Sequence, residues 1–206
     1  MTDPGLRERK KLRTREAIVD AALRLFEERG FDRVTIADIA EAADIAPRTF
    51  FGYFPSKDDV VFADFQMTLD GLSARLDDRS GDETAIDAIR AWIADRLEDV
   101  DVLDERERCR KRLIGESEAL AAHNRALMGR VEELLAEHIA RDLGDQPGEV
   151  RPRMIASAVI GALTALDVKG ADGSESPPTR EEALVIIDEA LTFLRGGLEA
   201  IRRSAG

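Results

Sequence analysis

The chain has 206 residues and a formal net charge of -12, and only 5% of its residues are aromatic. It lacks a run of about eighteen apolar residues, which excludes a conventional transmembrane helix, and its polar, basic start excludes a signal peptide of the usual kind. A single cysteine, Cys109, cannot form a disulfide within the chain and agrees with a reducing compartment. We therefore expect a cytoplasmic protein with a buried or merely tolerated thiol.

The composition predicts an all-α fold. Ala, Leu, Glu, Asp and Arg are abundant, and no regularly spaced short apolar strands are present, so about nine helices fit the length. We expect an N-terminal domain over residues 1–56 and a larger helical domain over residues 57–206. The first 57 residues hold eleven Lys and Arg against ten Asp and Glu, or +1, which leaves -13 for residues 58–206.

Cations are concentrated at the very start of the chain. Between residues 7 and 15, six Lys and Arg face only Glu8, a local charge of +5. Such a segment favours contact with phosphates, although a solvated helical turn with incidental charge is the alternative.

Three helices are predicted in the N-terminal region. Apolar residues between Ile18 and Phe26 fall on one face of a helix that should close at Gly30, where a positive φ is expected. Thr35 then begins a second helix, with Asp38 three places later in the capping-box position. A turn leads to Pro47, which suits the first position of a third helix.

The third helix should end near Pro55. The segment from Ser56 to Asp59 repeats the capping pattern, so a long fourth helix is expected to continue through residues 60–76. Five further helices are predicted over residues 84–100, 104–115, 117–142, 149–168 and 179–198.

The last two predicted helices differ from the others, because each is apolar on more than one side. A helix without a polar face must be covered all round, and pairing both helices with their symmetry mates would form a four-helix bundle across a two-fold axis. The simpler alternative is that both helices fill the centre of a monomer. The residues predicted for a dimer interface are Ile155, Val159, Leu163, Leu184, Ile187, Leu191 and Leu194.

Residues 35–57 contain the most informative motif, two short helices joined by a tight turn. Such a pair can place its second helix in the major groove of DNA, where base edges present distinct donors and acceptors. Helical spacing places Pro47, Phe50 and Phe54 on one side of this helix and Arg48, Thr49, Gly52 and Tyr53 on the other. The first set can anchor the helix, and the second set supplies a guanidinium, two hydroxyls and a close backbone approach.

This stretch resembles the DNA-binding domain of the TetR family of transcriptional regulators over about residues 12–66. The run TREAIVDAALRLFEERGFDRVTIADIA and the later TFFGYFPSK together carry the resemblance. It implies phosphate contacts by Thr35, Thr49, Tyr53 and Lys57, and positions near bases for Pro47, Arg48, Phe51 and Gly52. We add Arg13 of the basic arm to this set.

Three residues depart from the family pattern. Asp44 replaces a common glycine in the turn, but Asp tolerates positive φ better than most residues. Arg48 stands where glycine is frequent and adds a potential base contact. Phe51 stands where tyrosine is usual, so the tyrosine's hydrogen bond is absent and a scaffold role for this ring is favoured.

The resemblance also implies a homodimer that binds a near-palindromic operator, a small-molecule effector and no cofactor. An effector bound among the later helices would shift the helix after the motif, change the spacing of the two DNA-binding heads and release DNA. Residues that could line such a pocket, or equally belong to the core, are Phe62, Phe65, Trp92, Leu103, Leu113, Met128 and Met154.

The FFGYFPSKDD run resembles a subgroup with acyl-CoA-responsive regulatory domains, which implies a fatty acyl thioester as ligand class. The cations of residues 106–112 could meet its phosphates, or form a solvated basic face. A DNA-bound adaptor controlled by a protein partner stays open as the alternative. An enzyme is not expected, because His123 and His138 lack a second pair of metal-ligating residues.

Overall fold

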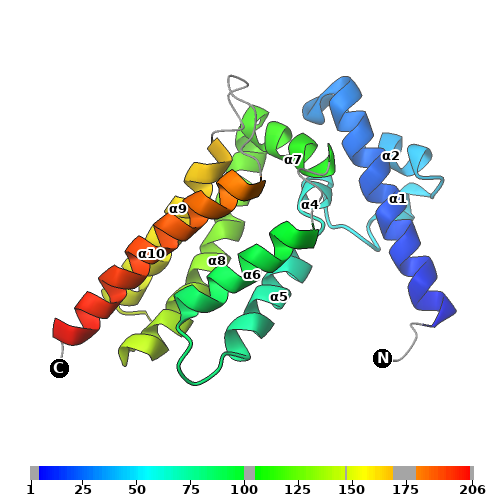
Figure 1. The fold of residues 1–206 in the computed structure, drawn as a ribbon. Coiled ribbons are helices and arrows are strands. Elements are labelled where there is room, and N and C mark those ends of the chain that lie inside the picture. The colour runs from blue at the N-terminus through cyan, green and yellow to red at the C-terminus, as the bar shows by residue number, and fades with distance from the viewer. Residues whose placement is uncertain (1–4, 100–104, 147, 169–179, 205–206) are drawn as a thin grey trace. The chain divides into compact units, whose positions relative to one another are not determined.

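The computed structural model describes residues 5–99, 105–146, 148–168 and 180–204. Within these ranges all regular structure is helical, with ten α-helices and one 3-10 helix (Figure 1). The predicted all-α fold is therefore confirmed. None of the described helices is long and apolar enough to span a membrane.

The chain divides into two compact units, and each is described by itself. The first unit contains residues 1–65 and 105–123, and the second contains residues 66–104 and 124–206. Helices of the first unit are α1 (Leu6–Arg29), η1 (Phe31–Arg33, the 3-10 helix), α2 (Ile36–Ala42), α3 (Pro47–Phe50), α4 (Lys57–Val61) and α7 (Glu105–Glu116). Helices of the second are α5 (Phe65–Asp77), α6 (Ala85–Asp99), α8 (Glu118–Leu143, whose first turns belong to the first unit), α9 (Val150–Val168) and α10 (Arg180–Ser204).

Each unit has its own apolar core. Ile18, Phe26, Ile39 and Phe50 are fully or almost fully buried in the first unit. Mainly aliphatic residues fill the second, and its large buried side chains include Leu76, Ile86, Ile89, Leu135, Ile139, Val159 and Leu191.

The predicted boundary at residues 56 and 57 differs from this division, because α7 completes the core of the first unit. Cys109 and Leu113 of α7 are 2% and 3% exposed and pack in the same cluster as Leu23 of α1. Burial raises the pKa of the Cys109 thiol to about 11, with Glu27 adding to the effect. The thiol is therefore protonated, and its burial agrees with the expectation from the sequence.

The predicted uninterrupted fourth helix is wrong. Helix α4 ends at Val61 and α5 begins at Phe65, so the chain breaks over residues 62–64. Arg15 of α1 donates a hydrogen bond to the carbonyl of Ala63, and its guanidinium lies 3.6 Å from a carboxylate oxygen of Asp64. The side chain of Arg15 thus bonds the backbone at the point where the helix is interrupted.

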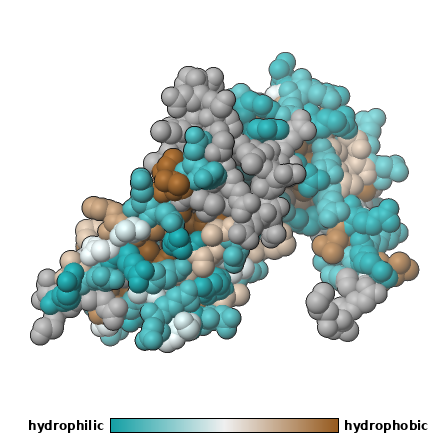
Figure 2. All heavy atoms as spheres, in the orientation of Figure 1, coloured by the Kyte–Doolittle hydropathy of each residue, from teal (hydrophilic) through white to brown (hydrophobic). Residues whose placement is uncertain are grey.

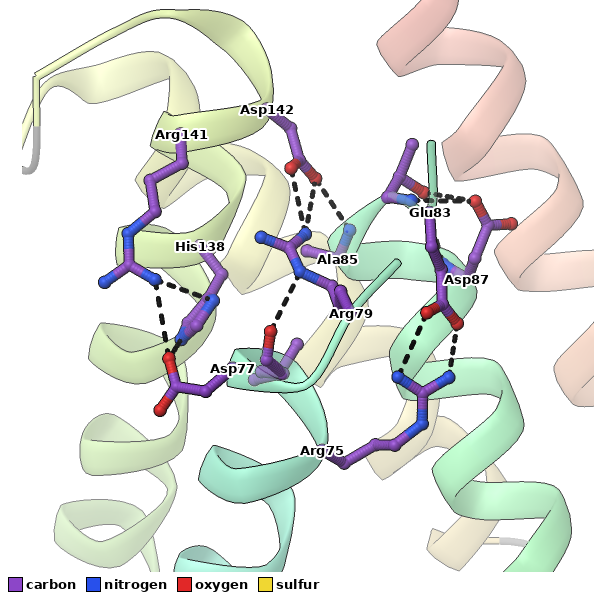
Figure 3. A network of polar contacts seen from close by, with 11 residues as sticks. Arg75, Asp77, Arg79, Glu83, Ala85, Asp87, His138, Arg141 and Asp142 are labelled. Atoms are coloured by element: carbon purple, nitrogen blue, oxygen red, sulfur yellow. Dashed lines mark hydrogen bonds and ion pairs between the residues drawn. The ribbon is translucent and has the colours of Figure 1, made fainter. Parts of the chain in front are cut away.

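A polar network in the second unit ties the loop between α5 and α6 to the end of α8 (Figure 3). The Nη1 atom of Arg79 lies 2.9 Å and 3.1 Å from the two carboxylate oxygens of Asp142, and its Nε donates to the carbonyl of Leu76. Asp142 also accepts the backbone N–H of Ala85 at 2.6 Å. This carboxylate therefore satisfies both a buried guanidinium and the start of α6.

Candidate DNA-binding interface

Aromatic side chains hold α3 against the first unit. Phe50 is 0% exposed and Phe54 is 3% exposed, and their ring centroids lie 5.9 Å apart. Pro47 occupies the first position of α3, as predicted, where its missing N–H costs nothing. A helix of four residues has little stability of its own, so this apolar anchor determines where α3 lies.

The opposite side of α3 and the turn after it are open to solvent. Pro47, Arg48, Thr49, Phe51 and Gly52 are all exposed. Phe51 meets Phe50 edge to face, with centroids 5.7 Å apart, yet 58% of it remains exposed. Its ring is therefore more available to a partner than the sequence suggested.

Tyr53 and Gly52 complete this surface in different ways. Tyr53 is half-buried and packs against the core. A Cβ atom at Gly52 would lie 3.2 Å from the carbonyl oxygen of Thr49, closer than most such contacts. Glycine thus allows the chain to turn tightly at the end of α3.

The start of α2 and the turn after it have the expected geometry. The Oγ1 atom of Thr35 accepts the N–H of Asp38 at 3.2 Å, and the Asp38 carboxylate accepts the N–H of Thr35 at 2.8 Å. The hydroxyl of Thr35, which also donates to the Asp38 carboxylate, and then the N–H of Thr35 hold the pKa of Asp38 below its usual value, with a smaller contribution from Arg29. Asp44 adopts φ 52 in the turn, so this residue takes the left-handed conformation that its type tolerates.

Lys57 has a structural environment that the sequence did not indicate. Its Nζ atom donates to the carbonyls of Phe31 at 2.7 Å and Val34 at 3.0 Å, and it lies 4.3 Å from the centroid of the Phe31 ring. A third carbonyl, that of Asp32, lies at 3.5 Å. The ammonium therefore bonds the start of α4 to the 3-10 helix η1 and to Val34 directly after it.

Arg15 is a positioning residue that sequence reasoning missed. Besides its bonds to residues 63 and 64, its guanidinium lies 5.1 Å from the centroid of the Phe54 ring. Arg15 thus links α1 to Phe54, four residues after the end of α3. No spacing rule in the sequence connects residues so far apart. Arg13, two residues earlier, is exposed.

The predicted pocket residues are distributed over both units. Leu113 is buried in the first core, and the Phe62 ring lies 4.6 Å from the His123 ring. Trp92 is half-buried beside the second core and stacks under Arg96. Phe65 and Met128 are half-buried, Met154 is 57% exposed, and Leu103 lies outside the described residues.

Several cations of α7 are engaged by acids of the first unit. Arg106 pairs with Asp20 and Arg112 with Glu27, both on α1. Arg110 pairs with Glu107 at 2.5 Å and with Asp64 at 3.4 Å. In this conformation these charges tie α7 to its neighbours.

Most residues predicted for a dimer interface belong to the chain's own core. Ile155, Val159, Ile187 and Leu191 are at most 7% exposed, and Leu163 and Leu194 are half-buried against the same cluster. The side chain of Leu184 lies outside the described set. Different apolar residues are exposed on the last two helices: Met154 at 57%, Val185 at 52% and Phe193 at 80%.

A short helix anchored by apolar residues, preceded by a tight turn and exposed on its polar side, defines a helix-turn-helix DNA-binding protein. Residues 18–63 match the family model described as bacterial regulatory proteins of the tetR family, and residues 83–199 match the MftR C-terminal domain. The chain belongs to the TetR family of bacterial transcriptional regulators, which confirms the resemblance found in the sequence.

Two relatives cover most of the chain. One is MftR of Mycobacterium tuberculosis, named for transcriptional regulation of mycofactocin biosynthesis, which is 33% identical over 77% of this chain and 81% of its own. The other is the regulator TcmR of Streptomyces glaucescens, 32% identical over 98% of this chain and 92% of its own.

Two solved structures share the fold. SmeT in complex with triclosan has a TM-score of 0.65 and 20% identity, with 87% of this chain and 90% of that chain covered. FadR of Thermus thermophilus in complex with lauroyl-CoA has a TM-score of 0.56 and 22% identity, with 87% and 92% covered.

Proposed function

We propose that the protein is a homodimeric repressor that binds a near-palindromic operator through α3 and is released by an amphipathic effector of the fatty acyl-CoA class. The observation that carries the proposal is the division of α3 and the turn after it, residues 47–54, into a buried aromatic side, Phe50 with Phe54, and an exposed side with Arg48 and Thr49. Polar groups left open on a fixed helix are what base recognition requires.

Each exposed group has a chemical partner in the major groove. Arg48 can donate two parallel hydrogen bonds to guanine O6 and N7, and the exposed ring of Phe51 suits a thymine methyl group. Thr49 and Tyr53 carry hydroxyls that can bind phosphates. Thr35 and Lys57 are proposed phosphate contacts as well, with Lys57 held in place by the carbonyls described above.

A homodimer is supported by the exposed apolar residues of α9 and α10. Phe193 alone is 80% exposed, and Met154 and Val185 are more than half exposed. On α9, Ala158 and Gly161 are exposed too, and small residues allow helices to approach closely. We therefore move the proposed interface from the predicted stripe to this one. A two-fold axis would set the recognition helices about 34–36 Å apart, in successive major grooves.

The effector class is supported by one likeness. The fold is that of a FadR that was solved with lauroyl-CoA. The large apolar residues predicted for the pocket, Trp92 and Met128 among them, suit an acyl chain.

Operator recognition is tested by selecting bound duplexes from a random pool and measuring affinity by fluorescence anisotropy. Arg48→Ala should relax preference at one base pair of each half-site, at a cost of about 1–3 kcal/mol. Arg24→Ala is the matched control, because Arg24 is an exposed arginine of the same unit whose partner is Glu28. Unchanged preferences in Arg48→Ala would remove it as a base contact.

The dimer is tested by sedimentation analysis of two matched variants. Phe193→Glu should yield monomers that bind operator weakly, because a charge would be placed in the proposed interface. Met67→Glu, at a 70% exposed position on α5, should leave the dimer intact. Equal sedimentation of both variants as dimers would contradict the proposed interface.

Effector release is tested with lauroyl-CoA, free coenzyme A and lauric acid. Lauroyl-CoA should lower operator affinity at fixed salt, and native mass spectrometry should detect its complex. If the protein binds lauroyl-CoA and operator affinity stays constant, the release mechanism fails. A regulator that binds none of the three small molecules would point instead to control by a protein partner.

A further inference from the structure

The first eight residues of α1 form a helix that contributes nothing to the core. Every residue from Leu6 to Arg13 is exposed, and the buried face of α1 begins only at Ile18. The N-terminal end also lacks a side-chain cap. Burial therefore does not explain this segment, residues 6–13, which we call the basic segment.

Its charge is both high and unbalanced. The segment holds five Lys and Arg and one acid, Glu8, or +4. Among the described residues, no ion pair involves the cations Arg7, Lys10, Lys11 and Arg13. Further along the same helix the arginines are paired, as Arg15 with Asp64, Arg24 with Glu28 and Arg29 with Asp38.

These cations lie at the unfavourable end of the helix. The N-terminus of a helix carries a partial positive charge, so anions stabilise it and cations in the first turn, such as Arg7, oppose it. A ligand with several negative charges would relieve both the dipole and the mutual repulsion. The basic segment thus has the electrostatics of a site for a polyanion.

The position of the segment relates it to α3. Arg15, two residues beyond the end of the basic segment, lies against the ring of Phe54, four residues after the end of α3. The basic segment therefore emerges from the first unit beside the recognition element. In Figure 2 the surface over the N-terminal part of α1 is mainly hydrophilic.

We propose that the basic segment binds DNA phosphates outside the base pairs that α3 recognises, and so supplies affinity without sequence preference; this inference rests on the proposed function. Eight helical residues span about 12 Å, over which one DNA strand carries about three or four phosphates. An anionic membrane is the other polyanion to weigh. Leu6 and Leu12 lie about 120° apart around the helix and form no apolar stripe, which favours DNA.

The test replaces all four of these cations, as Arg7→Gln, Lys10→Gln, Lys11→Gln and Arg13→Gln. Affinity for the selected operator and for an unrelated duplex is measured by anisotropy over a range of salt. The operator is used both trimmed to its edges and extended by about one helical turn on each side. The melting temperature should not fall, because these residues bury nothing and their charges oppose the helix dipole.

The quadruple variant should bind both duplexes about tenfold or more weakly at 0.1 M salt, and its salt slope should fall by about 0.9 for each phosphate that it no longer neutralises. Wild type should prefer the extended operator to the trimmed one, and the variant should show no such preference. As a charge-matched comparison, Lys10→Gln with Lys11→Gln should weaken binding more than Arg125→Gln with Arg153→Gln, a pair of exposed arginines in the second unit.

Three results would overturn the inference: an unchanged salt slope, a weakening confined to the operator, or pelleting with phosphatidylserine vesicles that is abolished in the quadruple variant while DNA binding stays constant. Failure of the proposed function looks different. In that case the wild-type protein itself selects no duplex from the random pool.

Discussion

The first unit holds a four-residue helix in place with aromatic side chains, whereas the second holds a loop in place with ion pairs. Phe50 and Phe54 form the anchor of α3, while the side chains of Arg48 and Thr49 are exposed and make no ion pair with the described residues. Around the loop between α5 and α6, Arg79 and Asp142 are 12% and 11% exposed and bind each other. An apolar anchor leaves the neighbouring polar side chains available to a ligand, whereas in an ionic anchor the polar side chains bind each other.

The largest effect should come from the aromatic anchor. Phe50→Ala should lower the free energy of unfolding by about 3–5 kcal/mol, because it removes a fully buried ring, and operator binding should be abolished with it. Phe51→Ala is the control, since its ring is 58% exposed. It should change stability by no more than about 0.5 kcal/mol and weaken operator binding only. Urea denaturation and anisotropy measure the two quantities, and equal destabilisation by both variants would contradict the two-sided description of α3.

The ionic anchor should rank next. Asp142→Ala leaves the guanidinium of Arg79 and the N–H of Ala85 without their shared acceptor, at a cost of about 3 kcal/mol. Asp188→Ala breaks the Arg90 pair, whose side chains are 54% and 46% exposed, and should cost less than about 1 kcal/mol. Thermal or urea unfolding separates the two cases. If the exposed pair cost as much as the buried one, burial would not be the source of the effect.

A smaller effect is expected from Lys57, whose ammonium both donates to backbone carbonyls and lies against the ring of Phe31. Lys57→Met keeps the apolar stem and removes the ammonium from the carbonyls of Phe31 and Val34, so stability should fall by about 1–2 kcal/mol. If Lys57 also binds a phosphate, the salt slope of operator binding should fall by about 0.9 for that phosphate. A variant with full stability would show that the carbonyl contacts contribute nothing.

The smallest effect concerns pH in the second unit. Burial lowers the pKa of His138 below its ordinary 6.5, and Arg141 and Arg79 lower it further, against the opposing influence of Asp77 and Glu137. Below pH 6.5 the imidazole of His138 takes up a proton in the unfolded chain, whereas in the folded chain it stays neutral until the pH reaches the lower folded pKa. The free energy of unfolding should therefore fall as pH drops through 6.5 toward the folded pKa, by at most about 1.4 kcal/mol per pH unit.

The variant His138→Leu should lose this part of the pH dependence in urea titrations at about pH 7.5 and 5.5. His123→Gln serves as the control and should keep the wild-type difference. A His138→Leu profile that matches wild type would assign the dependence to other groups.

Local patterns in the sequence predicted most of the helices and the exposed side of α3. Thr35 with Asp38, Pro47 and the turn at Asp44 all have the predicted conformation, because caps and turns are set by neighbouring residues. Helices α6 to α9 start and end within one residue of the predicted bounds, and α10 starts one residue late and continues six residues past its predicted end at residue 198.

Features set by distant residues could not be predicted in the same way. The break between α4 and α5 contains neither Gly nor Pro and depends on Arg15 of α1. Likewise, Ile187 was predicted for the dimer interface, yet only packing against other helices decides that Ile187 is 6% exposed and that Phe193, on the same helix, is 80% exposed. Lys57 suggested a phosphate contact, and nothing nearby indicated its bonds to residues 31 and 34.

The discontinuity of the first unit has a consequence for synthesis on the ribosome. Its core includes Cys109, Leu113 and Leu120, which are added long after residue 65. At about 5–20 residues per second, the nascent helix-turn-helix waits several seconds with part of its apolar surface uncovered. The DNA-binding head therefore matures only after residue 123 of 206 has left the exit tunnel.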